Sequence, residues 1–219
     1  MRLVSVNVGT AQPIASKGGT SGIYKLPVTT PVHVGPLGLE GDAIVDTKHH
    51  GGVDQAVYLF GTPDYEWWSA ELGRELAPGT FGENLTLSEL ASAESNIGDR
   101  LRVGAVLLEV TSPRIPCATL AVRMGDPTFV KRFREAERFG VYCRVIEQGA
   151  VQAGDPVSVE PYASATVSAL EMFRLRYAKQ YDPALLRRAL KAPLHLASRA
   201  EYEALLAMRE APGAANRPA

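Results

Sequence analysis

The residue best suited to chemistry in this sequence is Cys117, in the segment Ser112-Pro113-Arg114-Ile115-Pro116-Cys117. A free cysteine is often only a small buried hydrophobe. Cys117, however, follows a predicted strand end and two prolines, which places it on a stiff loop, and Arg114 is near enough to lower the pKa of its thiol. A thiolate is a soft ligand that suits thiophilic metals. The sequence therefore predicts that Cys117 acts chemically as a thiolate, with catalysis and metal ligation as its leading role.

The second cysteine lies in the segment Val141-Tyr142-Cys143-Arg144-Val145. Alternation along a strand puts Cys143 on a face with valines, so we assign it to the core. Arg144 then lies on the opposite face. It is an anion clamp if that face lines a cleft, and a surface charge if the face points outward.

The segment from Asp46 to Val57 contains His49, His50, Gly51 and Gly52 in a row. Adjacent histidines rarely point the same way, and no HExxH or CxxC pattern supplies further zinc ligands. One interpretation is a solvated Gly-Gly turn. The interpretation we favour is that the glycines let the backbone approach an anion while a histidine donates a hydrogen bond.

Two further segments carry polar side chains that suit a binding site. Residues 17–25 resemble a phosphate-cradling loop in composition, but they match neither a Walker A nor a GxGxxG pattern, so a surface loop is an equal alternative. In the segment Phe81-Gly82-Glu83-Asn84-Leu85, the acid either caps a strand or binds the amino edge of a heterocycle. A thiol hydrolase pairing of Cys117 with His49 or His50 has no accompanying signature.

The elements around these residues are mostly strands. Alternation and Gly or Pro punctuation predict extended segments at residues 3–8, 23–34, 41–46, 84–87, 100–111, 140–147 and 156–160. Short strands at this spacing, with few helices between them, favour a mostly β, α+β fold built on a closed or nearly closed mixed β-barrel with helical decorations.

Two helices interrupt the strands. Thr62-Pro63-Asp64 predicts a helix start with Thr62 as N-cap, and Asp126-Pro127 predicts a second. The expected buried positions are Tyr65, Trp68, Leu72 and Leu76 in the first helix, and Phe129, Val130 and Phe133 in the second.

After Pro161 the pattern becomes helical. Leu170, Phe173 and Tyr177 share one helical face, Asp182-Pro183 opens a second helix, and Ser198 is placed to cap a third. We therefore expect a β domain at residues 1–161, a three-helix domain at 162–211, and a flexible tail at 212–219.

The overall composition limits the classes of function. The chain has 219 residues, 46% of them hydrophobic, and a net charge of −1, so a basic surface for a nucleic-acid polymer is not expected. Two cysteines are too few for a disulfide framework. There is no signal-peptide pattern and no apolar run long enough for a bilayer, so we expect a cytoplasmic protein that does not bind membranes.

Taken in order, five segments resemble the MOSC domain, a family named for the C-terminal domain of molybdenum cofactor sulfurase. They are Gly41-Asp42, His50 to Val57, Phe81 to Leu85, Ile97-Gly98-Asp99 and Pro113 to Cys117. The closer likeness is to the stand-alone bacterial branch that detoxifies N-hydroxylated bases such as 6-N-hydroxylaminopurine. That branch carries a C-terminal three-helix domain.

The resemblance implies a molybdopterin cofactor and specific roles for several residues. Cys117 matches the family's molybdenum ligand. The residues expected to bind the cofactor are Lys25, His50, Gly51, Gly52, Glu83, Asn84, Arg114 and Arg144. The implied substrates are N-hydroxylated small molecules. Because the chain has no cysteine array for an iron–sulfur cluster and no dinucleotide fingerprint, a separate flavoprotein or ferredoxin-type protein is the expected electron donor.

Two other functions remain open from the sequence. Cys117 is also suited to carry sulfur as a persulfide. The protein could instead bind or carry the molybdenum cofactor without turnover. The C-terminal helices are expected to serve as a docking surface or as a contact in a homodimer.

Overall fold

The computed structural model describes residues 1–16, 19–47 and 50–210. Lys17, Gly18, Lys48 and His49, which belong to two predicted binding segments, lie outside the described residues, and so does the predicted tail at 212–219.

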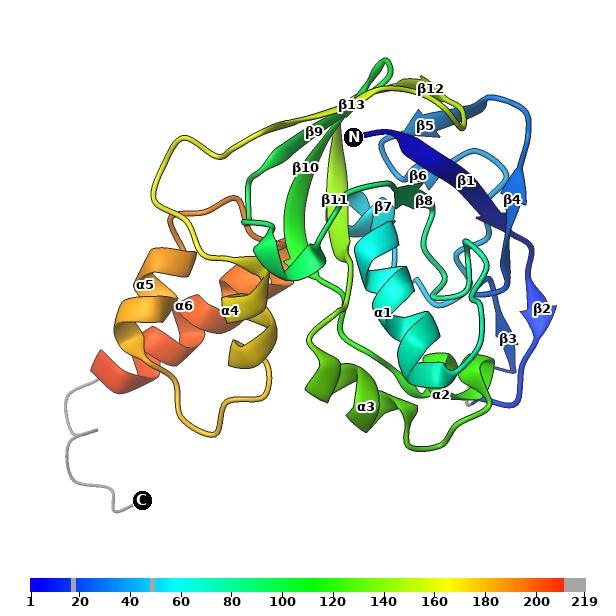
Figure 1. Ribbon diagram of the computed structural model, residues 1–219. Coiled ribbons are helices and arrows are strands. Elements are labelled where there is room, and N and C mark those ends of the chain that lie inside the picture. The colour runs from blue at the N-terminus through cyan, green and yellow to red at the C-terminus, as the bar shows by residue number, and fades with distance from the viewer. Residues whose placement is uncertain (17–18, 48–49, 211–219) are drawn as a thin grey trace.

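The largest element is a mixed sheet of eight strands, in which only the β7–β8 pair is parallel. Its spatial order is β13 (Val157–Glu160), β9 (Arg100–Val103), β10 (Val106–Pro113), β11 (Val141–Glu147), β7 (Val57–Gly61), β8 (Leu85–Leu87), β1 (Leu3–Gly9) and β4 (Lys25–Val28). The α+β class is therefore confirmed. Figure 1 shows these strands forming one curved layer.

The sheet is not a closed barrel, because its outer strands β13 and β4 are not paired with each other. A short seam, formed by an isolated bridge between Arg2 and Pro156, instead joins the start of β1 to the segment before β13. Beside this bridge, Leu3 donates its N–H to Asp155 O at 2.9 Å and accepts the N–H of Gly154 at 2.7 Å. The closed or nearly closed barrel expected from strand spacing is thus shown only in part, as a mixed sheet with this short seam and no closed barrel.

Two small sheets flank the large one. One has the order β12 (Gly149–Val151), β5 (Val32–Gly35) and β6 (Gly38–Leu39), and the other pairs β2 (Gln12–Pro13) with β3 (Thr20–Ser21). The extended segment expected at 23–34 is divided between β4 and β5. The segment expected at 41–46 forms no strand.

Helix α1 (Thr62–Leu72) packs its aromatic side chains against α3 (Phe129–Ala136). Trp68 stacks on Phe133 with a centroid distance of 5.7 Å, and both side chains are fully buried. The predicted N-cap was one residue late, because Gly61 occupies that position. Leu76 is buried but lies beyond the helix end at Gly73. The remaining short helices of this region are α2 (Ala118–Met124), η1 (Val53–Gln55) and η2 (Ser92–Glu94).

Three helices follow the sheet, α4 (Ala169–Leu175), α5 (Pro183–Ala189) and α6 (Leu196–Glu210), and Figure 1 shows them gathered at one side of the molecule. We call residues 169–210 the C-terminal helical unit. Helix α4 packs on β10 and η2, and Phe173 stacks on Phe139 at 4.4 Å. Asp182 caps α5 as expected, whereas α6 begins before the predicted cap Ser198. In the part of the chain that the structure describes, no helix has the length and apolar character of a membrane span.

Candidate functional site

A cavity of about 640 Å³ lies where β4, the end of β10, β11 and the segment following residue 50 meet. This volume falls within the usual range for small-molecule and cofactor sites. Seven of the residues singled out from the sequence belong to its lining: the predicted ligands Lys25, His50, Gly51, Asn84, Arg114 and Cys117, together with Tyr142. Gly52, Glu83 and Arg144 do not line it.

Cys117 lies just after β10, at the N-cap position of α2, with an extended backbone. The side chain is partly buried in the cavity wall. Burial alone would raise the pKa of this thiol, but a hydrogen bond with His50, the charge of Arg114 and the N–H of Leu120 together lower the pKa to about 6. A thiol with that pKa is about nine-tenths ionised at neutral pH. Cys117 is therefore a thiolate under ordinary conditions.

Arg114 is buried beside this thiolate, with its Nη2 atom 3.9 Å from Cys117 Sγ. Its Nη1 atom donates to the hydroxyl of Tyr142, and the guanidinium lies 5.2 Å from the centre of the Tyr58 ring. Burial would lower the pKa of Arg114, but the two phenols and the Cys117 thiolate raise it. The guanidinium Nε is buried and has no hydrogen-bond partner among the described residues. The Nε–H group of Arg114 is thus a buried hydrogen-bond donor that the described residues leave without an acceptor.

The glycines next to His50 have backbone conformations that favour glycine. Gly51 and Gly52 have φ angles of 75° and 78°, a region that side chains other than glycine rarely adopt. A Cβ atom on Gly51 would also lie only 2.9 Å from the side chain of Ile44. The chain can therefore turn tightly here and bring His50 to Cys117. Gly52 contributes to the turn and caps η1 without lining the cavity.

Lys25 is a cation whose charge is already matched. Both carboxylate oxygens of Asp42 accept from its Nζ, and Asp42 also accepts from Asn84 Nδ2 and from the N–H of Gly9, each at 2.9 Å. Burial lowers the pKa of Lys25, while Asp42 opposes that change. The Asn84 carbonyl oxygen accepts from the N–H of Tyr58 at 3.1 Å. Lys25 and Asn84 are thus held rigidly at the cavity wall by Asp42.

Glu83, predicted to bind the cofactor, is instead fully buried beneath the wall. Its Oε1 atom accepts from the Tyr65 hydroxyl and the Gly79 N–H, both at 2.6 Å, and from the Thr86 hydroxyl at 2.8 Å. Burial raises the pKa of this carboxyl, and the hydrogen bonds oppose the rise. Glu83 therefore ties together the segments that carry Asn84, and we no longer count it among the cofactor contacts.

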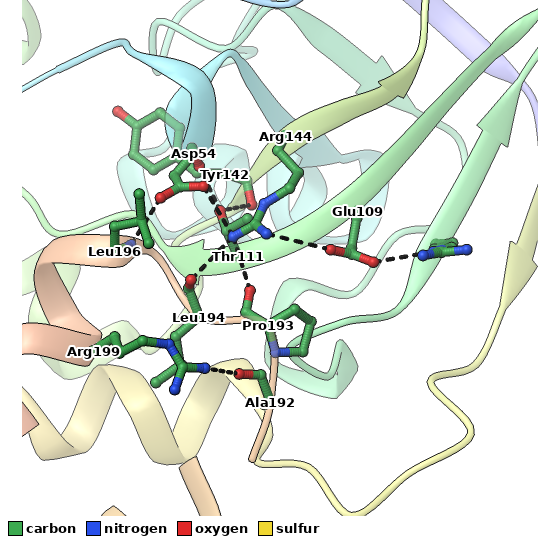
Figure 2. Close-up of polar contacts among 11 residues, drawn as sticks. Asp54, Glu109, Thr111, Tyr142, Arg144, Ala192, Pro193, Leu194, Leu196 and Arg199 are labelled. Atoms are coloured by element: carbon green, nitrogen blue, oxygen red, sulfur yellow. Dashed lines mark hydrogen bonds and ion pairs between the residues drawn. The ribbon is translucent and has the colours of Figure 1, made fainter. Parts of the chain in front are cut away.

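Arg144 also lies away from the cavity, where it joins the sheet to the C-terminal helical unit (Figure 2). Its Nη2 atom is 2.9 Å from Asp54 and also donates to the carbonyls of Pro193 and Leu194, at 3.1 and 3.0 Å. Its Nη1 atom is 3.7 Å from Glu109. With these acceptors around it, the guanidinium is no free anion clamp, and we remove it from the proposed cofactor contacts.

Several lining residues were not singled out as contacts in the sequence. They include Thr20 and Ser21 of the loop with predicted phosphate-binding character and Ser16 next to that loop, together with Gln55 and Arg176. The loop's composition was a usable signal for the first two. Arg176 comes from the C-terminal helical unit, and its local sequence gives no sign that it reaches this cavity.

A MOSC domain model matches residues 46–158, just over half of the chain. The chain belongs to the MOSC domain family. This MOSC protein is 34% identical over 154 residues to YflK of Bacillus subtilis (strain 168), covering 69% of this chain and 70% of the relative. It is 33% identical over 199 residues to a protein named "Reductase" from Gibberella moniliformis, covering 88% of this chain and 35% of that longer relative.

Among solved structures, YiiM from Geobacillus stearothermophilus superposes on this MOSC protein with a TM-score of 0.78 and 28% identity, over 94% of this chain and 98% of YiiM. The predicted family is therefore confirmed, and the likeness is to the YiiM-like branch. MOSC domains are associated with molybdenum cofactor families.

Proposed function

We propose that the protein is a molybdenum-cofactor-dependent oxidoreductase that reduces N-hydroxylated compounds, such as hydroxylaminopurine-like bases, hydroxylamines and amidoximes, to amines. The observation that carries this proposal is the Cys117 thiolate in the wall of a ligand-sized cavity, with a pKa lowered to about 6. Family membership and a relative named a reductase support it.

The side chains of the cavity suit a metal whose other ligands are supplied by a cofactor. Within residues 1–16, 19–47 and 50–210, no three His, Cys, Asp or Glu side chains are grouped to hold a metal ion. Cys117 would therefore be a single soft protein ligand, with the dithiolene of a molybdopterin supplying others. The unused Nε donor of Arg114 fits a ligand that brings hydrogen-bond acceptors or negative charge.

When bound, the molybdenum cofactor would supply the redox step that removes oxygen from the N–OH group. The chain's own residues prepare the site for it. His50 and Arg114 keep the Cys117 thiol ionised, so no proton has to leave when the ligand binds. Asp42 fixes Lys25 and Asn84 along the wall. Apolar residues such as Ile23, Ile44 and Ile115 also line the cavity and limit the water inside it.

Electrons must reach this site from another protein under the same proposal. The sequence has only two cysteines, and Cys143 is buried in the core, so the chain has no ligands for an iron–sulfur cluster. We propose a cytoplasmic setting with a flavoprotein or ferredoxin-type donor. A homodimer through the C-terminal helical unit belongs to the same proposal.

The test is metal analysis combined with turnover. The protein is purified from a molybdate-supplied host, its molybdenum and pterin contents are measured, and reduction of an amidoxime or 6-N-hydroxylaminopurine is followed with dye-supplied electrons. We expect bound molybdenum, amine formation, and loss of both in Cys117→Ser with the fold retained. Cys143→Ser is the matched control and should keep both. Wild-type protein with neither metal nor turnover would refute the proposal.

A second candidate function rests on the same lowered pKa. A thiolate that is ionised at neutral pH can accept sulfur from a desulfurase and carry it as a persulfide. Intact-protein mass spectrometry after incubation with a cysteine desulfurase and cysteine tests this function. A sulfur adduct that disappears in Cys117→Ser supports it, and the absence of an adduct on wild-type protein rules it out. Bound cofactor without turnover under any donor would indicate a cofactor carrier instead.

A further inference from the structure

Among the described residues, three lysine or arginine side chains line the cavity, and they differ in how far their charges are already matched. Lys25 is paired with both oxygens of Asp42. Arg114 contacts Tyr142 and the Cys117 thiolate. For Arg176, the described residues provide no side-chain hydrogen bond and no ion pair. Among these three cations, Arg176 is therefore the most available to an incoming anion.

The backbone of Arg176 is nevertheless firmly placed. The residue directly follows α4, and its N–H donates to Met172 O at 3.3 Å. Met172, Phe173 and Leu175 are buried, and Phe173 stacks on Phe139 next to β11. The packing thus fixes the point from which the Arg176 side chain extends, while the side chain itself is exposed. Such an arrangement lowers the entropy cost of presenting a guanidinium to a ligand.

The two arginines of the cavity lining differ in their exposure to solvent. Arg114 is buried beside Cys117, whereas Arg176 is exposed to solvent. The hydroxyls of Ser16, Thr20 and Ser21 lie in the same lining and add hydrogen-bonding groups. A ligand with its reactive part at Cys117 and an anionic group further out therefore matches the chemistry of the lining at both ends.

We propose that Arg176 binds a phosphate monoester group of the ligand that fills this cavity, so that the C-terminal helical unit completes the site. A guanidinium fork binds phosphate through two parallel N–H···O bonds, which an ammonium group cannot reproduce. The phosphate has two possible sources: the pterin cofactor, or a substrate that is an N-hydroxylated nucleotide. The second source rests on the proposed function, whereas the phosphate subsite itself rests on the geometry of Arg176.

The first experiment tests the subsite without any redox activity. Protein produced without molybdate is titrated with inorganic phosphate, and binding is followed by ³¹P NMR and by the thermal unfolding midpoint. We expect Arg176→Ala to weaken phosphate binding about tenfold, and Arg176→Lys to recover part of that loss. The matched control is Lys179→Ala, an exposed cation of the same helical unit outside the cavity lining. Equal binding by wild type and Arg176→Ala, or no binding by wild type, overturns the proposal.

The second experiment identifies the source of the phosphate in protein from a molybdate-supplied host. If the cofactor supplies it, Arg176→Ala should lose pterin and molybdenum, whereas Lys179→Ala should not. If the substrate supplies it, cofactor content stays constant, and KM rises for an N-hydroxylated nucleoside monophosphate while KM for the free base does not change. Unchanged cofactor content together with unchanged KM for both substrates overturns the proposal. If wild-type protein binds no molybdenum, the proposed function fails and the phosphate titration still decides the role of Arg176.

Discussion

The guanidinium of Arg144 lies 2.9 Å from the carboxylate of Asp54, and this ion pair joins β11 to η1. The other oxygen of Asp54 accepts the N–H of Leu196 at 2.7 Å, where a negative charge is favoured by the helix dipole. The backbone carbonyl of Asp54 lies 2.5 Å from the Thr111 hydroxyl. Asp54 thus connects α6 to the chain that runs between His50 and Gln55 in the cavity wall.

Removing this carboxylate should destabilise the protein strongly. Asp54→Ala leaves the partly buried Arg144 with one less counter-charge and the Leu196 N–H without its acceptor, so we expect a loss of about 2–4 kcal/mol in the free energy of unfolding. Urea denaturation measures it. The matched control is Arg102→Ala, which breaks an exposed ion pair with Glu147 and should cost much less, because solvent screens that pair. Equal losses in the two variants would contradict this role of Asp54.

The reactivity of Cys117 should follow its lowered pKa. We expect the rate of alkylation by iodoacetamide to rise with pH around a midpoint of about 6, and His50→Ala to move that midpoint upward because a hydrogen bond to the thiolate is lost. The folded protein binds this proton less tightly than the unfolded chain. The stability contributed is therefore present above the unfolded-state pKa and is lost as the pH falls through 6.

Cys117→Ser supplies the control for this measurement. Cys143 is fully buried, and burial raises the pKa of its thiol, so the variant should remain unmodified while it is folded. A midpoint near the ordinary cysteine value in wild-type protein would show that the thiol is not activated.

Glu83 should produce the opposite dependence of stability on pH. Its folded-state pKa is raised by burial, so its favourable contribution is present below the unfolded pKa and is lost as the pH rises through the folded pKa. Glu83→Gln removes the titration. We expect the stability of wild type relative to this variant to fall as the pH rises above the ordinary pKa of a glutamate, measured by urea unfolding. Glu160→Gln, at an exposed position of β13, should show no such change.

The turn at Gly51 should not tolerate a side chain. Gly51→Ala adds a residue at a positive φ, which costs about 1 kcal/mol, and places a Cβ against Ile44, which adds about 1 kcal/mol or more. Gly73→Ala is the control, since Gly73 also has a positive φ but nothing lies within 4 Å of the added atom. The difference between the two in thermal or urea unfolding isolates the contact with Ile44. No difference would mean that Ile44 relaxes freely.

The elements with local signals were predictable from sequence. Asp182 followed by Pro183 marks the start of α5, and the structure places Asp182 as its cap. Strand β7 was missed because all five of its residues are buried, so it shows no alternation for a sequence pattern to detect. The expected closed or nearly closed barrel was confirmed only as an α+β fold with a mixed sheet, because closure depends on contacts between distant strands and strand spacing carries no information about those contacts.

The candidate site also contains some residues that the sequence could predict and others that it could not. His50, Gly51, Asn84 and Cys117 line the cavity as predicted, because the family resemblance supplied positions that local patterns could not. Tyr142 reaches the cavity but Arg144, two residues along the same strand, does not. The pairing of β10 with β11 is irregular between Val110 and Ser112, and such irregularities add twist that alternation does not anticipate.

The seam between Arg2 and Pro156 has a consequence for the order of folding. The bridge joins the start of β1 to the segment before β13, so β1 has one of its neighbours among the last residues of the β region. Contacts of such high sequence separation form late and slow folding. During synthesis, the backbone N–H and C=O of Leu3 lack their partners until Gly154 and Asp155 have emerged, and a chaperone that covers nascent strands would act in this interval.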